Sequence, residues 1–283
     1  IDSNNPLTPR GYVNRLWLHH FGQGLVRSPN NFGFRGDPPT HPRLLDWLAA
    51  ELVSGGWKLK RMHRLIMLSG TYQMASTSHQ ANLKADPINN LFWRFNMRRL
   101  SAEEIRDSVL AVNGALNRKK MFGPSIYTII PNEIKQGQSR PGSGWGNSPP
   151  VERNRRSIYV HVKRSLIVPM FESFDGPDLD STCPVRFTTT QPTQSLALLN
   201  SQFSNREAGV FAMLVFEKAG EDRAAQVRLA LSRATQRQPA EREIQQGVAL
   251  IDALVKEEKA SPRDALKYFC LLTLNLNEFL YLD

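Results

Sequence analysis

Apolar side chains recur with helical spacing near the start of the chain. Thr8 and Pro9 are a typical helix start, because proline suits the first helical position. The side chains that follow at i, i+3, i+4 and i+7 form one largely apolar stripe: Val13, Leu16, Trp17 and His20. Gly22 and Gly24 then stop the pattern.

Three more helices are predicted in the first 120 residues. One opens at Thr40 and Pro42 and ends at Gly55, and another runs from about 58 to 72. Ser101 and Glu104 have the spacing of a capping box and start the third. The last third of the chain repeats the helical pattern in five segments, 193–201, 205–219, 222–235, 240–258 and 262–277.

The middle of the chain has a different pattern. Ser125–Ile130 and Ser157–Lys163 are rich in β-branched and aromatic residues, and the second alternates apolar with polar positions, so we predict two strands, which can pair with each other. Between them, Pro131–Arg156 is rich in Pro, Gly, Ser and Asn and holds one large aromatic residue, Trp145. We expect this long segment to be disordered or to wrap the surface, although a functional loop stays open.

These patterns predict a mainly α fold, a multi-helix bundle with a short β-hairpin or strand pair near the middle. We expect three regions within one compact domain. They are an N-terminal basic helical region at 1–124, a strand pair with a long Pro/Gly-rich loop at 125–164, and a C-terminal helical region at 165–283.

The charge of the chain is unevenly distributed. The net charge is +10. Residues 1–100 hold 13 Lys and Arg against 5 Asp and Glu, a net charge of +8, whereas residues 101–220 carry +3 and residues 221–283 carry −1. A basic surface can concentrate an anionic polysaccharide or another acidic partner, and it can also serve solubility alone. No pattern of a nucleic-acid-binding module is present, so a nucleic acid is an unlikely partner.

Cysteine count and hydropathy exclude some classes. Two cysteines, Cys183 and Cys270, exclude a disulfide-rich scaffold and a four-cysteine zinc site. Cys270 lies on an apolar helical face, which favours a buried thiol, and a bond between the two cysteines stays open. No apolar run approaches the roughly 18 residues of a membrane helix, so we expect no membrane span. Ile1 is not an initiator Met, so we expect an upstream segment that held any signal peptide.

The histidines and the loop after the first helix provide a candidate site. His20 and His63 lie on or beside apolar stripes, so we expect both to be packed side chains. The polar flank of the first helix and the following loop can bring together five other residues: Arg15, His19, Arg35, Asp37 and His41. This holds if the first two helices pack antiparallel.

Four interpretations of this cluster stay open. Arginines and neutral imidazoles suit an anion or a sugar. A His/Asp pair suits acid–base catalysis, whereas a metal site is disfavoured because two arginines repel a cation. In the fourth interpretation, Arg35, Asp37 and Thr40 only pin the loop and cap the second helix.

A second polar cluster is a weak candidate for a metal. Asp175, Asp178 and Asp180 place three carboxylates in a turn that resembles part of a calcium loop, but the full EF-hand pattern is missing and turn formation explains it more simply. Arg153, Arg155 and Arg156 precede the second predicted strand and are expected to pair with these acids.

Several longer motifs run through the whole chain. They include Asn5-Pro-Leu-Thr-Pro-Arg10, Val13-Asn-Arg-Leu-Trp-Leu-His-His-Phe-Gly22, Asn31-Phe-Gly-Phe-Arg-Gly-Asp-Pro-Pro-Thr-His-Pro42, Arg155-Arg-Ser-Ile-Tyr159, Phe174-Asp-Gly-Pro-Asp178, Cys183, Gln194-Ser-Leu-Ala-Leu-Leu-Asn200 and Asn277-Glu-Phe-Leu-Tyr281. Together they resemble the planctomycete-specific domain family, a domain of unknown function numbered 1553. The chain departs from the family pattern at Leu18 and in Thr188–Gln191.

The resemblance implies a context rather than a reaction. It implies the C-terminal part of a large exported protein, located in the periplasm or at the cell surface, with an upstream domain of the same polypeptide as a partner. A cytochrome-c-like domain often precedes that domain in the family. This chain has no Cys-x-x-Cys-His motif, so we expect no cofactor here and any haem to lie upstream.

Two functions from different classes follow. The preferred one is a non-catalytic recognition or scaffolding domain that binds an anionic polysaccharide or its own upstream domain. The alternative is a polysaccharide-acting enzyme domain with the His/Asp/Arg site in the N-terminal third. No nucleophile elbow or phosphate loop supports catalysis, so whether the chain is an enzyme stays uncertain at this stage.

Overall fold

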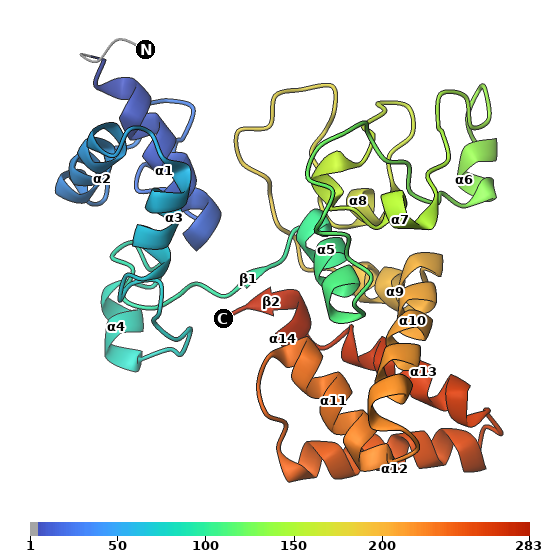
Figure 1. Ribbon diagram of the computed structural model, residues 1–283. Helices are drawn as coiled ribbons and strands as arrows, with labels where there is room; N and C mark the ends of the chain where they lie inside the picture. The colour runs from blue at the N-terminus through green and yellow to red at the C-terminus, as the bar shows by residue number, and fades with distance from the viewer. Residues whose placement is uncertain (1–4) are drawn as a thin grey trace. The chain divides into compact units, whose positions relative to one another are not determined.

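The structure is a computed structural model that describes residues 5–283. The chain divides into two compact units, which we call the N-terminal unit, up to Arg98, and the C-terminal unit, Arg99–Leu282 (Figure 1). Each unit has its own buried apolar side chains, and each is described by itself below. The two units do not test the predicted arrangement of one domain with regions at 1–124, 125–164 and 165–283, which stays a prediction.

The described part of the N-terminal unit contains four helices, and the first three lie close to where the sequence predicts them. The four are α1 (Leu7–Phe21), α2 (Pro42–Ser54), α3 (Leu59–Met67) and α4 (Gln80–Ala85). Helix α1 ends at Gly22, whose φ of 75° is easily adopted only by glycine. Helix α3 stops at Met67, five residues before the predicted end, because Tyr72 belongs to a turn closed on Ser69.

The core of the N-terminal unit is unusually aromatic. The Trp17 and Phe21 rings stack with centroids 4.2 Å apart, and Phe92 meets both edge-on. His20 packs against the edge of this cluster, on Tyr72, and its Nε2 lies 2.9 Å from Nδ1 of His63. The prediction that His20 and His63 are packed, hydrogen-bonded side chains is therefore confirmed.

A buried asparagine fixes the chain as it leaves α1. Asn14 is fully buried, and its Nδ2 donates to the carbonyl oxygen of Val26 while its Oδ1 accepts from the Val26 amide, at 3.1 and 2.8 Å. A Cβ on Gly24 would lie 2.8 Å from this carboxamide and 2.6 Å from the Val26 oxygen, so only glycine fits there. Asn14 and Gly24 thus set the start of the loop that carries the predicted site.

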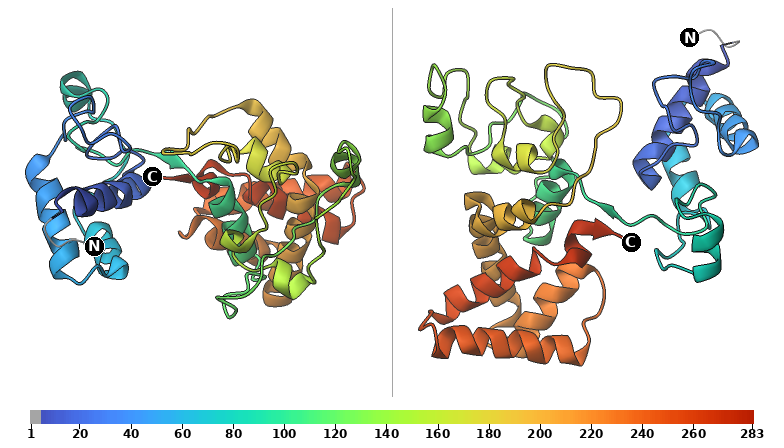
Figure 2. Two further views of the ribbon diagram at one scale, coloured as in Figure 1. Left: turned by 90° about the horizontal axis from the view of Figure 1, so that it is seen from above. Right: turned by 180° about the vertical axis from the view of Figure 1, so that it is seen from behind.

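The C-terminal unit holds the two longest helices of the described residues, α10 and α12. Its helices outside residues 118–190 are α5 (Ala102–Val112), α9 (Pro192–Asn200), α10 (Gln202–Ala219), α11 (Arg223–Thr235), α12 (Glu241–Lys256), α13 (Pro262–Thr273) and α14 (Asn277–Leu280). Ser101 and Glu104 form the predicted capping box of α5. Helix α10 packs against α13, α11 and α5, and in the right view of Figure 2 the orange and red helices α11–α13 lie together below the green and yellow part of the unit. Their shared core is mostly aliphatic, with Phe211 and Phe269 at its centre.

The two segments predicted as strands meet, but not as a hairpin. Ile126 and Val160 form a single parallel bridge, and Ser157–Tyr159 is a 3₁₀ turn. The backbone turns there because the Ser157 amide is held by the Asp107 carboxylate of α5, 2.8 Å away. The two-stranded sheet lies elsewhere, between β1 (Arg98–Arg99) and β2 (Tyr281–Leu282).

The segment 131–156 follows the surface of the C-terminal unit and contains α6 (Asn132–Gln136) and α7 (Pro150–Arg153). Trp145 fastens it, because its Nε1 donates to the Thr128 carbonyl oxygen at 3.0 Å. The Tyr127 amide donates to Ser148 Oγ at 2.9 Å. Helix α8 (Pro169–Ser173) follows, and its contact with α9 closes this side of the unit.

The fold class is as predicted, mainly α with one short strand pair. Both cysteines are unbonded, Cys183 at the surface and Cys270 in the core, where burial raises the pKa of the Cys270 thiol. Among residues 5–283, no helix is long and apolar enough to cross a membrane.

Asn14→Ala is expected to destabilise the protein by about 2 kcal/mol, because it leaves the Val26 amide and carbonyl buried without partners. Urea unfolding of the whole chain, followed by tryptophan fluorescence, measures this; four of the five tryptophans precede residue 99. Asn82→Ala is the matched control, since Asn82 is exposed on α4. Equal unfolding midpoints for the two variants would show that the Asn14 contacts contribute nothing.

His20 makes stability depend on pH. Burial, then the neighbouring charges of His63, Arg98 and His19, lower the pKa of His20 from 6.5 to about 4. The unfolded chain therefore binds the proton first, so this contribution is complete above pH 6.5 and is lost as the pH falls toward 4.

Because His20 is only partly buried, solvent screening reduces the expected loss between pH 7 and pH 5 to about 1 kcal/mol. Urea midpoints measured at the two pH values test this, and His20→Gln should flatten the difference. A wild-type chain that is equally stable at pH 7 and pH 5 would contradict the assignment.

Candidate functional site

The predicted site residues on α1 and in the loop after it do not share a common partner in the structure. Arg15 is exposed on α1, and its Nη2 donates to Asn30 Oδ1 at 2.8 Å. His41 Nδ1 lies 3.0 Å from Thr40 Oγ1, and Thr40 itself donates twice to the Leu25 carbonyl oxygen. Thr40 thus pins the loop, whereas His41 stands at the N-cap of α2 and provides no side-chain cap.

The remaining members of this predicted site lie at the surface. Asp37 is exposed, and its backbone amide is held by Ser28 Oγ at 2.8 Å. Arg35 is exposed and makes no hydrogen bond or ion pair with any residue in 5–283. His19 is exposed on α1 and takes part in an interaction there. That the five residues bind one ligand stays a prediction.

The acidic turn after α8 is engaged in contacts of its own. Asp175, at a left-handed φ of 58°, accepts from Arg99 Nη2 at 2.6 Å and from the amide and hydroxyl of Thr189, both at 2.8 Å. These partners hold the pKa of Asp175 below its usual value against the opposing effect of burial. Asp178 accepts from the Asp180 amide. Within the described part of the chain, no three His, Cys, Asp or Glu residues are arranged to hold a metal ion.

The arginines expected to pair with these acids do not do so, and that prediction is wrong. Arg155 lies 3.4 Å from Glu152, and Arg156 lies 3.5 Å from Asp107, whereas Asp180 pairs with Arg164. The reason is long-range packing, because the segment that carries the three arginines lies against α5.

A buried guanidinium holds this segment in place. Arg106 of α5 is 3% exposed and donates to the Arg153 and Arg155 carbonyl oxygens and to Ser157 Oγ. Burial lowers the pKa of Arg106 to about 10, so the group stays charged at neutral pH beside Asp107. One side chain thereby fixes both the end of α7 and the turn that follows it.

Arg155 supplies a second buried guanidinium in the same region. Arg155 is 0% exposed, its Nη1 donates to the Pro124 carbonyl oxygen at 3.0 Å, and its Cζ lies 4.1 Å from the centre of the Tyr159 ring. Its Nη2 has no hydrogen-bond partner among the described residues. Arg155 therefore forms the base on which the neighbouring surface is built.

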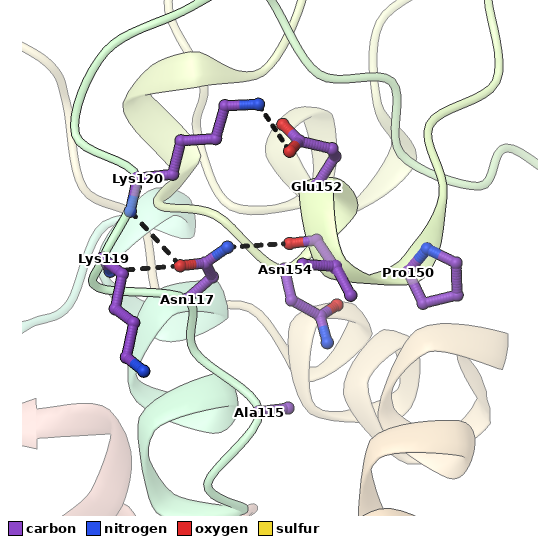
Figure 3. Close-up of a pocket in the computed structure, with 8 residues that line it drawn as sticks. Ala115, Asn117, Lys119, Lys120, Pro150, Glu152 and Asn154 are labelled. Carbon is purple, nitrogen blue, oxygen red and sulfur yellow. Dashed lines mark hydrogen bonds and ion pairs between the residues drawn. The ribbon is translucent and has the colours of Figure 1, made fainter.

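That surface is hollowed by a pocket of about 560 Å³ (Figure 3). Two segments build it, the chain after α5 and the start of α7. They meet because Asn117 donates from its amide to the Asn154 carbonyl oxygen at 2.9 Å, and from Nδ2 to Val151 at 3.1 Å. The pocket is lined by Ala115, Asn117, Lys119, Lys120, Pro150, Val151, Glu152 and Asn154.

The segment that surrounds this pocket is strongly basic. Residues 118–164 contain ten Lys and Arg residues and two acidic residues, a net charge of +8 over 47 residues. Several of the basic side chains are exposed, namely Arg118, Lys119, Lys120, Arg140, Arg156 and Arg164. A count of charge over residues 101–220 hides this concentration, because acidic residues on either side cancel it, whereas a count in shorter windows would have found it.

Aromatic rings accompany the basic segment. Tyr127, Trp145 and His161 form a half-buried trio, with the Tyr127 and His161 centroids 4.9 Å apart and Trp145 within 6 Å of both. The Lys163 ammonium donates to the Ser143 carbonyl oxygen beside them. The trio fixes segment 131–149 on the unit and keeps these basic residues together.

Fold and site together define a mainly α protein with a basic, pocketed surface on its C-terminal unit. The sequence matches the PSD1 family, described as a protein of unknown function (DUF1553), over residues 1–251. The chain belongs to this family. No curated protein and no solved structure gives a significant match.

Arg106→Met is expected to destabilise the protein by about 3 kcal/mol, because it leaves the Arg153 and Arg155 carbonyl oxygens and the Ser157 hydroxyl without their buried donor and removes a counter-charge of Asp107. Arg106→Lys should recover less than half of this loss, because one ammonium cannot reach all three acceptors. Urea unfolding followed by circular dichroism measures both variants, and Arg118→Gln is the control at an exposed position. A lysine variant as stable as the wild type would show that the three-way contact is not needed.

Proposed function

We propose that this chain is a non-catalytic recognition domain that binds an anionic polysaccharide through the basic segment 118–164 of the C-terminal unit. The observation that carries the proposal is the net charge of +8 in 47 residues around a preformed pocket. Residues 58–99 hold a similar net charge, +7 in 42 residues, so the pocket is what distinguishes segment 118–164. A polyanion is attracted to such a local concentration of positive charge.

The way the segment is held supports recognition of a polymer. The buried guanidinium groups of Arg106 and Arg155 hydrogen-bond to its backbone, and the rings of Tyr127, Trp145 and His161 pack together within it. Exposed cations on a fixed backbone lose less conformational entropy on binding than cations on a flexible tail. The exposed apolar side chains of Val151, Ile158 and Val162 lie in the same segment and suit the C–H faces of sugar rings.

The wider context is part of the same proposal. We infer that the chain belongs to an exported multidomain protein of planctomycete type, in the periplasm or at the cell surface. An upstream domain of the same polypeptide would be its second partner. Segment 118–164 would then bind the polysaccharide, and another surface of the chain would contact the upstream domain.

Binding of the full chain to alginate, dextran sulfate and neutral dextran tests the proposal. We expect both polyanions to bind at 50 mM NaCl, with affinity at least about tenfold lower at 300 mM, and the neutral dextran to stay unbound. The triple variant Lys119→Gln, Lys135→Gln, Arg140→Gln should weaken polyanion binding about tenfold.

The matched control is Arg43→Gln, Lys58→Gln, Lys60→Gln, which removes equal charge from exposed positions of the N-terminal unit. Equal losses in the two triple variants would contradict the assignment to segment 118–164. Tighter binding of double-stranded DNA than of either polyanion would contradict a polysaccharide ligand.

A further inference from the structure

The pocket beside α7 carries a more specific inference, which rests on the proposed function and names the chemistry of the sugar bound. The charged side chains that line the pocket differ in whether they already have an ion-pair partner. Lys120 Nζ lies 2.6 Å from Glu152 Oε1, and this contact, ahead of the attraction of Arg155, lowers the pKa of Glu152. The Lys120–Glu152 pair is therefore neutral as a whole and already satisfied.

Lys119 is the free cation of the pocket. Its ammonium makes no hydrogen bond or ion pair with any residue in 5–283, and Figure 3 shows it directed away from the Lys120–Glu152 pair. The backbone beneath it is fixed, since the Lys119 amide donates to Asn117 Oδ1 at 3.1 Å. One available positive charge on a fixed backbone matches one negative charge on a ligand.

The rest of the lining suits the neutral part of a sugar. The carboxamide of Asn154 has no partner within the described chain, so a donor and an acceptor are open to hydroxyl groups. Glu152 keeps acceptor capacity beyond its pair with Lys120. Pro150 and Val151 supply the apolar wall, and Val151 is 70% exposed. Pockets of this kind bind through apolar contact and orient the ligand by a few polar groups.

We propose that this pocket binds one singly charged sugar residue of the polysaccharide, with its carboxylate or sulfate ester on Lys119 and its hydroxyls on Asn154 and Glu152. The shared chemistry is a monoanionic pyranose, and uronates and sugar sulfates are its two sources. A neutral hexose lacks the charge that Lys119 requires. A dianionic phosphate ester would bring a second negative charge to the same group, and the described lining has no second unpaired cation to match it.

Titration of the full ¹⁵N-labelled chain with glucuronate, glucose 6-sulfate and glucose, followed by NMR, tests this. We expect the side-chain amide signal of Asn154 and the backbone signal of Lys119 to shift with at least one of the two monoanions, and not with glucose. The stronger of the two identifies the source of the charge.

Two variants test whether the sugar binds in the pocket. Lys119→Gln should weaken the monoanion about tenfold, and Asn154→Ala about fivefold. Lys60→Gln, which removes the same charge from an exposed position of α3, should change nothing. Glucose that shifts the same signals as strongly, or equal effects of Lys119→Gln and Lys60→Gln, would overturn the inference.

The outcome is separable from that of the proposed function. Alginate binding that is lost in the 118–164 triple variant, without any response of Asn154 to the monoanions, would overturn the pocket inference alone. Monoanion binding in the pocket without salt-sensitive polymer binding would overturn the proposed function and leave the pocket assignment in place.

Discussion

The buried guanidinium of Arg106 is the contact on which the candidate site depends. Its nitrogens donate to two carbonyl oxygens and one hydroxyl of the segment that follows α7, so a single residue of α5 positions backbone about fifty residues away. A buried charge is tolerated only where its donors are satisfied and a counter-charge is near, and Asp107 supplies that charge. Together with the hydrogen bonds of Asn117 to Val151 and Asn154, this arrangement holds α7 in place as one wall of the pocket.

The two units solve the problem of core packing with different side chains. The N-terminal unit adds a cluster of contacting aromatic rings to its aliphatic core residues, with His20 and His63 at the edge, whereas the C-terminal unit fills its core mainly with aliphatic side chains of α10, α11 and α13. Flat rings cover much area with few residues. Amphipathic helices can instead present continuous aliphatic stripes to one another.

Local patterns predicted the helices well because helix starts are local. The capping box at Ser101 and the prolines at the starts of α2 and α13 mark their boundaries in the sequence itself. The predicted strands failed because Ser157 is held by α5, a contact that no window of neighbouring residues contains. The pocket was missed for the same reason, since its two walls are joined through Asn117 and Asn154. The basic segment could have been found, because its charge is a property of the sequence alone.

The contacts of Asp175 have a consequence for how the family can vary. Asp175 and Thr189 are bound to each other, so the chain leaves and returns at nearly the same point, and the thirteen residues between them form a closed excursion. For such a loop, each doubling of length costs only about 0.6 kcal/mol in closure entropy. Insertions among residues 184–188, beyond the motif residues Gly176–Asp178 and Cys183, would therefore cost little while α9 and the core stay as they are.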